Sequence, residues 1–343
     1  MLFGIDYETW WFLVVGALFS GYAILDGFDF GAGAWHLLFE SEKDRRIALN
    51  AVGPVWDGNE VWLVIAGGAL FAGFPNFYAT LFSSLYIPFK LFLVFIIFRA
   101  IAIEFRSKEP GERWRKNWDR AYCISSIFLA FLLGVVLGNL LQGISVGENY
   151  LYMGNGFFEF LGFYPVLVGL TTLALFMMHG AIFLLIKTRG SLHEKLTKLL
   201  RVGMISFIIL FSMVTIFSLI YYPHLSDKFR AYPILFFIPA LAILSMANIP
   251  RLASKRNYLG AFLFSSLTIS FLLVLVAVEL YPDLLVSTLG PQYSINIYQA
   301  AASKGSLKIM LTITAIGAPL VAFYTFFVYK TFWGKVRLDE NSY

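Results

Sequence analysis

The stretch Gly53–Trp62, with the sequence GPVWDGNEVW, stands at the head of an apolar run that continues to Phe74. Two carboxyl groups, Asp57 and Glu60, lie three residues apart within it. A run this apolar is typical of a membrane span or a deep core, where an acid is costly unless it is paired, hydrated or protonated. Residues three apart share one face of a helix, so the two acids are expected side by side.

The first apolar segment of the chain repeats this pattern, because Asp26 and Asp29 are also three residues apart. Acids that lie within the membrane on aligned helix faces indicate a functional site, most often a path for protons or cations.

The composition indicates a membrane protein. Hydrophobic residues make up 59% of the chain and charged residues 14%, whereas soluble domains are about 25% charged. No basic segment precedes the first apolar run, which is therefore expected to be a retained span and not a signal peptide. The single cysteine, Cys123, excludes an intrachain disulfide and a cysteine-ligated cluster supplied by this chain alone.

Nine apolar stretches each approach the length of about 20 residues that crosses a bilayer. They span approximately residues 9–37, 51–74, 78–104, 119–141, 161–187, 201–222, 232–248, 258–281 and 307–333. The sequence therefore predicts an all-α integral membrane protein with nine transmembrane helices, forming one polytopic membrane domain over residues 1–343. The seventh stretch is the shortest and contains Pro233 and Pro239.

Basic residues gather in alternate loops, which predicts the orientation. The segments after the first, third, fifth, seventh and ninth stretches hold most of the 26 lysines and arginines. The other loops carry only Lys228, Arg230, Lys304 and Lys308. This split predicts an N-terminus outside and a C-terminus in the cytoplasm, and it attributes the net charge of +5 to topology and not to nucleic-acid binding.

With this orientation, the first three spans place their ionisable residues in one half of the membrane. The acids are Asp26, Asp29, Asp57, Glu60 and Glu104. The third span adds Lys90, expected near mid-depth, and Arg99 near the inner surface. Two interpretations remain open: Lys90 or Arg99 neutralises an acid so that the helices can fold, or the group conducts or buffers protons. For the group as a whole we favour the second.

The four histidines test whether the chain carries haem. His193 and His224 fall in loops, His36 lies at the inner end of the first span, and only His179 falls clearly within a span. Helix packing with a local hydrogen bond is a better interpretation of both than axial ligation, so no haem ligand and no metal site are predicted. Gly27 and Gly31, like the later pair Gly134 and Gly138, have the four-residue spacing of small residues that lets helices pack closely.

Several motifs together resemble subunit II of the cytochrome bd quinol oxidases. They are LDGFDFG at 25–31, GPVWDGNEVW at 53–62, AGGALF at 66–71, EFR at 104–106 and the C-terminal PLV, VYK and GKV at 319–321, 328–330 and 334–336. The resemblance spans the whole chain, and the second-helix motif is long and specific.

This resemblance implies a non-haem partner of a haem-bearing subunit I in a quinol:oxygen oxidoreductase of the prokaryotic cytoplasmic membrane. Haem b, haem d and the quinol site belong to subunit I in that family, and subunit II is required for assembly of the haem centres. Complexes of the family can also include a small accessory membrane subunit. Some members bind a quinone in this subunit, so a structural quinone or lipid is a further expectation.

The resemblance also assigns roles to residues. Acids at the positions of Asp26 and Asp57 are the family's candidates for carrying protons toward the oxygen-reducing haem, and Trp62 matches a tryptophan where oxygen is thought to enter. Glu60 stands where other members can have glutamine, so the implied proton role is firmer for Asp57.

Two other classes of protein fit part of the pattern. A proton-coupled secondary transporter would share the nine spans and the buried acids, but the sequence has no clear inverted repeat and no paired broken helices. A stand-alone haem protein is disfavoured by the few histidines within spans.

Overall fold

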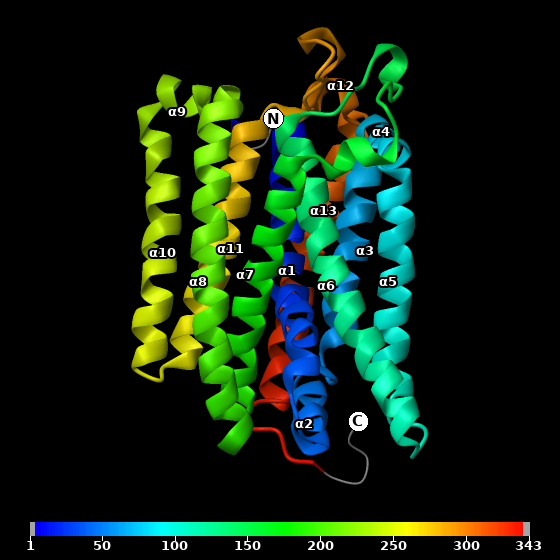
Figure 1. Ribbon diagram of the computed structural model, residues 1–343. Coiled ribbons are helices and arrows are strands. Elements are labelled where there is room, and N and C mark those ends of the chain that lie inside the picture. The colour runs from blue at the N-terminus through cyan, green and yellow to red at the C-terminus, as the bar shows by residue number, and fades with distance from the viewer. Residues whose placement is uncertain (1–3, 339–343) are drawn as a thin grey trace.

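The computed structural model describes residues 4–338 and forms a bundle of long, roughly parallel helices (Figure 1). Eight of its segments are long and apolar enough to cross a membrane. They are α1 (Tyr7–Trp35, continued by η1, His36–Leu38), α5 (Tyr86–Phe105), α6 (Glu112–Gln142), α7 (Phe163–Lys187), α8 (Gly190–Tyr221), η5 with α10 (Pro233–Phe236 and Phe237–Ser254), α11 (Tyr258–Leu280) and α13 (Lys304–Thr331).

A ninth candidate is the bent pair formed by α3 (Trp56–Gly73) and α4 (Pro75–Ser84), whose axes differ by 120°. Figure 1 shows α3 rising through the bundle and α4 lying at the end where α1 begins. The predicted fold class, an all-α integral membrane protein, is confirmed, and this bent pair is the candidate for the ninth predicted span.

Two breaks divide the segments that the sequence predicts as the second and third spans. Residues 51–52 end a separate helix, α2 (Glu42–Val52), and a turn at 53–55 precedes α3. Pro54, which has no N–H to donate, stands in that turn. Pro75 begins α4, so α5 starts at Tyr86 and not near residue 78. Lys90 therefore lies in the first turns of α5, far from the mid-depth that the sequence predicts.

Several helices extend beyond the predicted spans at the end opposite to the start of α1. Helix α6 begins at Glu112, directly after Pro110 and Gly111, and α8 begins at Gly190, where φ is +68°. Charged residues of these extensions are good helix formers, so the helices continue past the apolar stretch until a glycine or proline interrupts them. The basic residues used to predict orientation are consequently largely helical.

The centre of the bundle is α1, which packs against α3, α6 and α7. A side chain at Gly31 would overlap the carbonyl oxygen of Phe176 in α7, and one at Gly180 would meet the backbone of Gly31. At Gly134 of α6 an added Cβ would lie 2.7 Å from Cα of Gly169 in α7. The glycines therefore let the backbones of α1 and α6 approach that of α7 closely, as their spacing predicts.

Short elements cover the end of the bundle where α1 begins. They are η2 (Glu148–Tyr150), η3 (Phe157–Leu161), η4 (Pro223–Ser226), α9 (Asp227–Ala231), β1 (Asp283–Leu285), η6 (Pro291–Tyr293), β2 (Ile295–Asn296) and α12 (Ile297–Ala300). Strands β1 and β2 pair antiparallel. At the opposite end, the segment after α13 is tied to α7, because the N–H of Val336 donates to the Lys187 carbonyl at 2.9 Å.

Candidate functional site

Three carboxyl groups converge on one guanidinium between α1, α3 and α5. Arg99 donates twice to Asp26, from Nη2 to Oδ1 at 2.5 Å and from Nη1 to Oδ2 at 3.1 Å. Its Nη1 also donates to Oε1 of Glu60 at 3.0 Å, and its Nη2 lies 4.0 Å from Oδ2 of Asp29. We call Asp26, Asp29, Glu60 and Arg99 the carboxyl cluster.

The cluster lies in the apolar part of the bundle. Asp26, Asp29 and Arg99 have no exposed surface, and 17% of the Glu60 side chain is exposed. The guanidinium carbon of Arg99 stands 4.3 Å from the centre of the Phe30 ring, a cation–π arrangement that adds to its fixed position. The spacing of Asp26 and Asp29 puts both on one face of α1, where Asn59 of α3 and Arg99 of α5 reach them.

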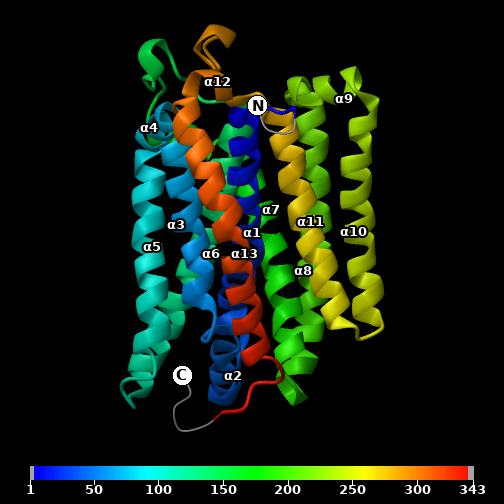
Figure 2. The same cartoon turned by 180° about the vertical axis from the view of Figure 1, so that it is seen from behind.

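The carboxyl group of Asp29 is held by the amide of Asn59, and that amide is held by the phenol of Tyr329. Nδ2 of Asn59 donates to Oδ2 of Asp29 at 2.7 Å and to the Leu25 carbonyl at 3.1 Å. The hydroxyl of Tyr329, near the end of α13, donates to Oδ1 of Asn59 at 2.9 Å. Figure 2 shows α13 passing in front of α1 beside α3.

The charge of the cluster is not balanced by its own members. One guanidinium faces three carboxyl groups, so full ionisation would leave two uncompensated negative charges where charge is costly to bury. Taking up protons is the simplest way to lower that cost. The arrangement can therefore accept and release protons.

The other predicted residues lie outside the cluster. Asp57 is exposed in the first turn of α3, three residues before Glu60, and Glu104 is half-buried in the last turn of α5. Trp62 is half-buried and its ring lies against Gly21 of α1. Lys90 is exposed with its Nζ 4.3 Å from the centre of the Tyr86 ring, so the structure does not bring it to the acids.

Sequence reasoning missed Asn59 and Tyr329. Each belongs to a quoted motif, Asn59 to the one at 53–62 and Tyr329 to the one at 328–330. Each is a polar side chain inside an apolar helix, which was the available signal. The sequence could not show that they bond to each other, because they are 270 positions apart.

A second polar cluster, also missed, ties the helix ends on the side away from the start of α1. Asp119 of α6 pairs with Nε2 of His36 at 2.6 Å, accepts from Nη1 of Arg45 at 3.1 Å and accepts from Nε of Arg106 at 2.5 Å. Arg106 also donates to Glu42 at 2.9 Å. We call this group the Asp119 clamp. A cavity of about 480 Å³ beside it is lined by charged residues, among them Arg45 and Asp119.

The side chains of His36 and His179 contact other residues of the protein. Nε2 of His179 lies 3.0 Å from the Ile24 carbonyl and donates to it, and Nδ1 lies 2.6 Å from the Ser265 hydroxyl. The ring stacks on Phe262 at 4.6 Å, and His36 is held by Asp119. Within residues 4–338 no group of three or more metal-binding side chains occurs. Both ring nitrogens of His179 and Nε2 of His36 therefore have protein partners.

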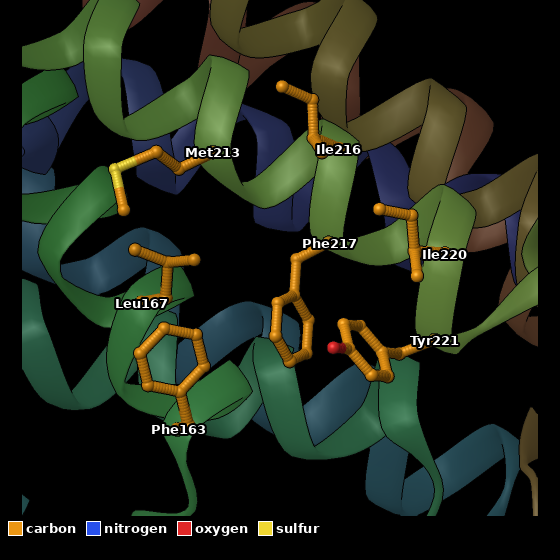
Figure 3. Close-up of a pocket in the computed structure, with 7 residues that line it drawn as sticks. All are labelled: Phe163, Leu167, Met213, Ile216, Phe217, Ile220 and Tyr221. Atoms are coloured by element: carbon orange, nitrogen blue, oxygen red, sulfur yellow. The ribbon is translucent and has the colours of Figure 1, made fainter.

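An apolar cavity of about 210 Å³ lies between the end of α8 and the start of α7 (Figure 3). Its lining includes Phe163, Met213, Phe217 and Tyr221, which Figure 3 shows around one hollow. It is distant along the bundle from the Asp119 clamp, which ties the opposite helix ends, and its lining suits a hydrocarbon chain.

Comparisons with known proteins agree with this architecture. The family described as cytochrome bd terminal oxidase subunit II matches residues 7–332. Cytochrome bd-I ubiquinol oxidase subunit 2 of Escherichia coli K12 is 31% identical over 98% of this chain and 97% of that protein. Probable cytochrome oxidase subunit 2 of Haemophilus influenzae is 33% identical over the same shares. A chain of the bd oxidase from Geobacillus thermodenitrificans superposes with a TM-score of 0.79 at 19% identity, covering 95% of this chain and 98% of that one, which shows a shared fold.

The helical bundle with its buried acids is thus a subunit of a membrane-bound terminal oxidase. The chain belongs to the cytochrome bd terminal oxidase subunit II family. As such it is part of an oxidoreductase complex, and the resemblance predicted from its motifs is confirmed. This membership disfavours the secondary-transporter and stand-alone haem interpretations.

Proposed function

We propose that this chain is the non-haem subunit II of a quinol:oxygen oxidoreductase in a prokaryotic cytoplasmic membrane. It packs against a subunit I that carries haem b, haem d and the quinol site, supports assembly of those haems, and conducts protons toward the oxygen-reducing haem. The carboxyl cluster is the observation that supports the proton role most directly.

Proton supply is a chemical requirement of this reaction. Reducing oxygen to water consumes protons, and a haem within the membrane cannot obtain them from lipid. Carboxyl groups within hydrogen-bond reach of one another and of water can pass protons in steps. Taking these protons from the cytoplasm, while quinol oxidation releases protons outside, would conserve energy across the membrane.

Asp57 stands near the start of this proposed path, on an exposed face of α3. The Asp57 side chain is exposed. Val61, Val64 and Phe71, which lie on the same face of α3, are also exposed, with exposed fractions of 46%, 73% and 58%. An exposed acid in line with apolar side chains on a membrane helix suits contact with another membrane subunit. Asp57 would pass protons between subunit I and the Glu60 end of the carboxyl cluster, with Glu104 on the cytoplasmic side.

The test of the proton role is Asp57→Asn in the assembled oxidase, because the amide keeps the shape and removes the titratable group. Quinol oxidation, normalised to haem d, should slow about tenfold, equal to roughly 1.4 kcal/mol in one barrier. Asp57→Glu should recover part of the rate. Asp227→Asn, which alters an exposed acid in α9, is the matched control and should have full activity. Full normalised activity in Asp57→Asn would remove Asp57 from the path.

The orientation is tested by labelling. Lys116 and Lys195 lie near the starts of α6 and α8, and the native Cys123 is buried. Cysteines at Lys116 and Lys195 should react with an impermeant reagent only from the cytoplasmic side. Reaction of both from outside would reverse the orientation and the direction of the proton path.

Three further expectations of the family resemblance belong to this proposal. Trp62 would border the entry of oxygen, so Trp62→Leu should change the KM for oxygen more than the KM for quinol. A small accessory membrane subunit would join the complex. A structural quinone or lipid would occupy this subunit, for which the apolar cavity between α7 and α8 has a suitable lining.

A further inference from the structure

The two aspartates of the carboxyl cluster have different surroundings. Both oxygens of Asp26 accept from the Arg99 guanidinium, at 2.5 and 3.1 Å. Oδ2 of Asp29 lies 4.0 Å from Nη2 of the same guanidinium, which is beyond hydrogen-bond distance. Asp26 therefore has the geometry of a bidentate ion pair, which suits a permanent carboxylate, whereas Asp29 does not.

The orientation of the Asn59 amide is set by its partners. Tyr329 can donate to the amide oxygen, while the Leu25 carbonyl can only accept and so requires the amide NH₂. The NH₂ group therefore faces Asp29 and donates to Oδ2 at 2.7 Å. This chain of two hydrogen bonds, Tyr329 to Asn59 to Asp29, fixes which oxygen of Asp29 is occupied.

The second oxygen of Asp29 is left open. Oδ1 is buried and has no hydrogen-bond partner within residues 4–338. An ionised carboxylate with one bare oxygen and no bidentate cation is costly in an apolar interior. A proton on Oδ1 removes that cost, and it also lowers the uncompensated charge of the cluster from two negative charges to one.

We propose that Asp29 is the member of the carboxyl cluster that holds and releases the transferred proton, on Oδ1, and that Asn59 and Tyr329 are positioning residues for it. This inference rests on the proposed proton role of the chain. In loading, an O–H bond forms on Oδ1 with a proton from water on the cytoplasmic side. In release, that bond breaks and the proton passes to water or to a carboxylate on the way to subunit I. Asp26 stays ionised with Arg99 in both states.

The experiment uses infrared spectroscopy of the intact oxidase complex in H₂O and D₂O. A protonated carboxyl group has a carbonyl band, separate from the amide bands, that moves on deuteration. We expect this band to be absent in Asp29→Asn and present in Glu60→Gln. Tyr329→Phe should shift the band, because Asn59 loses the bond that orients it. Tyr324→Phe, on the same helix and 65% exposed, is the matched control and should leave the band in place.

Turnover provides an independent measurement. Quinol oxidation per haem d should slow about tenfold in Asp29→Asn and about twofold to threefold in Tyr329→Phe, with no change in Tyr324→Phe. A band that persists in Asp29→Asn, or that disappears in Glu60→Gln instead, would overturn the assignment to Asp29. If Asp29→Asn does not assemble, the pair of tyrosine variants decides: equal band positions in both would overturn the positioning role.

The failure of this inference differs from failure of the proposed function. If Asp57→Asn slows turnover but the band survives in Asp29→Asn, the subunit conducts protons and Asp29 is not the group that holds them. If no acid variant slows turnover in assembled enzyme, the proposed proton role itself is wrong, and a proton on Asp29 would have no transfer to serve.

Discussion

The carboxyl cluster and the Asp119 clamp use the same kinds of side chain in different proportions. In the first, three carboxyl groups share Arg99, whereas in the second two carboxyl groups, Asp119 and Glu42, face two arginines, and Asp119 also pairs with His36. Arg99 lies in α5 and Arg106 directly follows the last residue of this helix, seven residues further on, so the two groups are stacked about 10 Å apart along the helix axis. Their difference is one of charge ratio and not of composition.

This ratio separates two functions. A carboxylate already neutralised by cations serves as a tie, and Asp119 joins the ends of α1, α2, α5 and α6 in this way. A group with more carboxyls than cations has capacity for protons. The comparison predicts that breaking the clamp costs stability alone, while altering the acids of the carboxyl cluster costs turnover.

Removing the shared cation should have the largest effect. Arg99→Leu would leave Asp26 and Glu60 without their partner, and breaking a buried pair in this way costs about 3–5 kcal/mol. We expect little assembled complex and a loss of haem, measured by the haem spectrum of purified membranes. Normal assembly of Arg99→Leu would show that the cluster is fully protonated and does not need its cation.

Loss of the clamp carboxylate should have an intermediate effect. Asp119→Asn keeps one acceptor oxygen but removes the charge facing Arg45 and Arg106, at a cost of about 1–3 kcal/mol. The melting temperature of the complex should fall, while turnover per haem d stays near that of the parent enzyme. A normal melting temperature with slow turnover would place Asp119 in the proton path, and the clamp and the carboxyl cluster would then not differ in function.

Glu159, in η3, has a carboxylate whose hydrogen-bond donors are all neutral groups. Burial acts to raise the pKa of Glu159, but hydrogen bonds from Ser145, the Asn155 N–H and Tyr152 outweigh it, so the pKa lies below its ordinary value. A lowered pKa stabilises the folded loop above the ordinary value, about 4.3, and this contribution is lost as pH falls through the folded pKa. Hydrogen exchange in residues 143–162 should therefore increase in acid, and Glu159→Gln should abolish that dependence.

Lys90 should show the smallest effect. It sits on α5 with Arg99 but is exposed beside Tyr86, so Lys90→Leu should change stability by no more than about 0.5 kcal/mol. It is the control for Arg99→Leu, since both replace a cation of one helix by leucine. Loss of haem in Lys90→Leu would mean that its exposed face meets a partner in the complex.

The sequence alone was sufficient for the class of the protein and for naming the four residues of the carboxyl cluster. Apolar length predicts the spans, the spacing of Asp26 and Asp29 predicts their shared face, and the glycines at 27 and 31 predict close packing, because each depends only on local helix geometry. The motifs at 25–31 and 53–62 were sufficient to identify the family.

Only the tertiary structure decided which charges meet. Arg99 pairs and Lys90 does not, because the bend after Gly73 shortens the third span and moves Lys90 to its end. Likewise, the bond from Tyr329 to Asn59 joins helices at opposite ends of the chain. Hydrophobic periodicity specifies which face of a helix is buried, but the rotation and height of one helix against another follow from side-chain packing between them. That packing separates a carboxylate tied by arginine from one with an open oxygen.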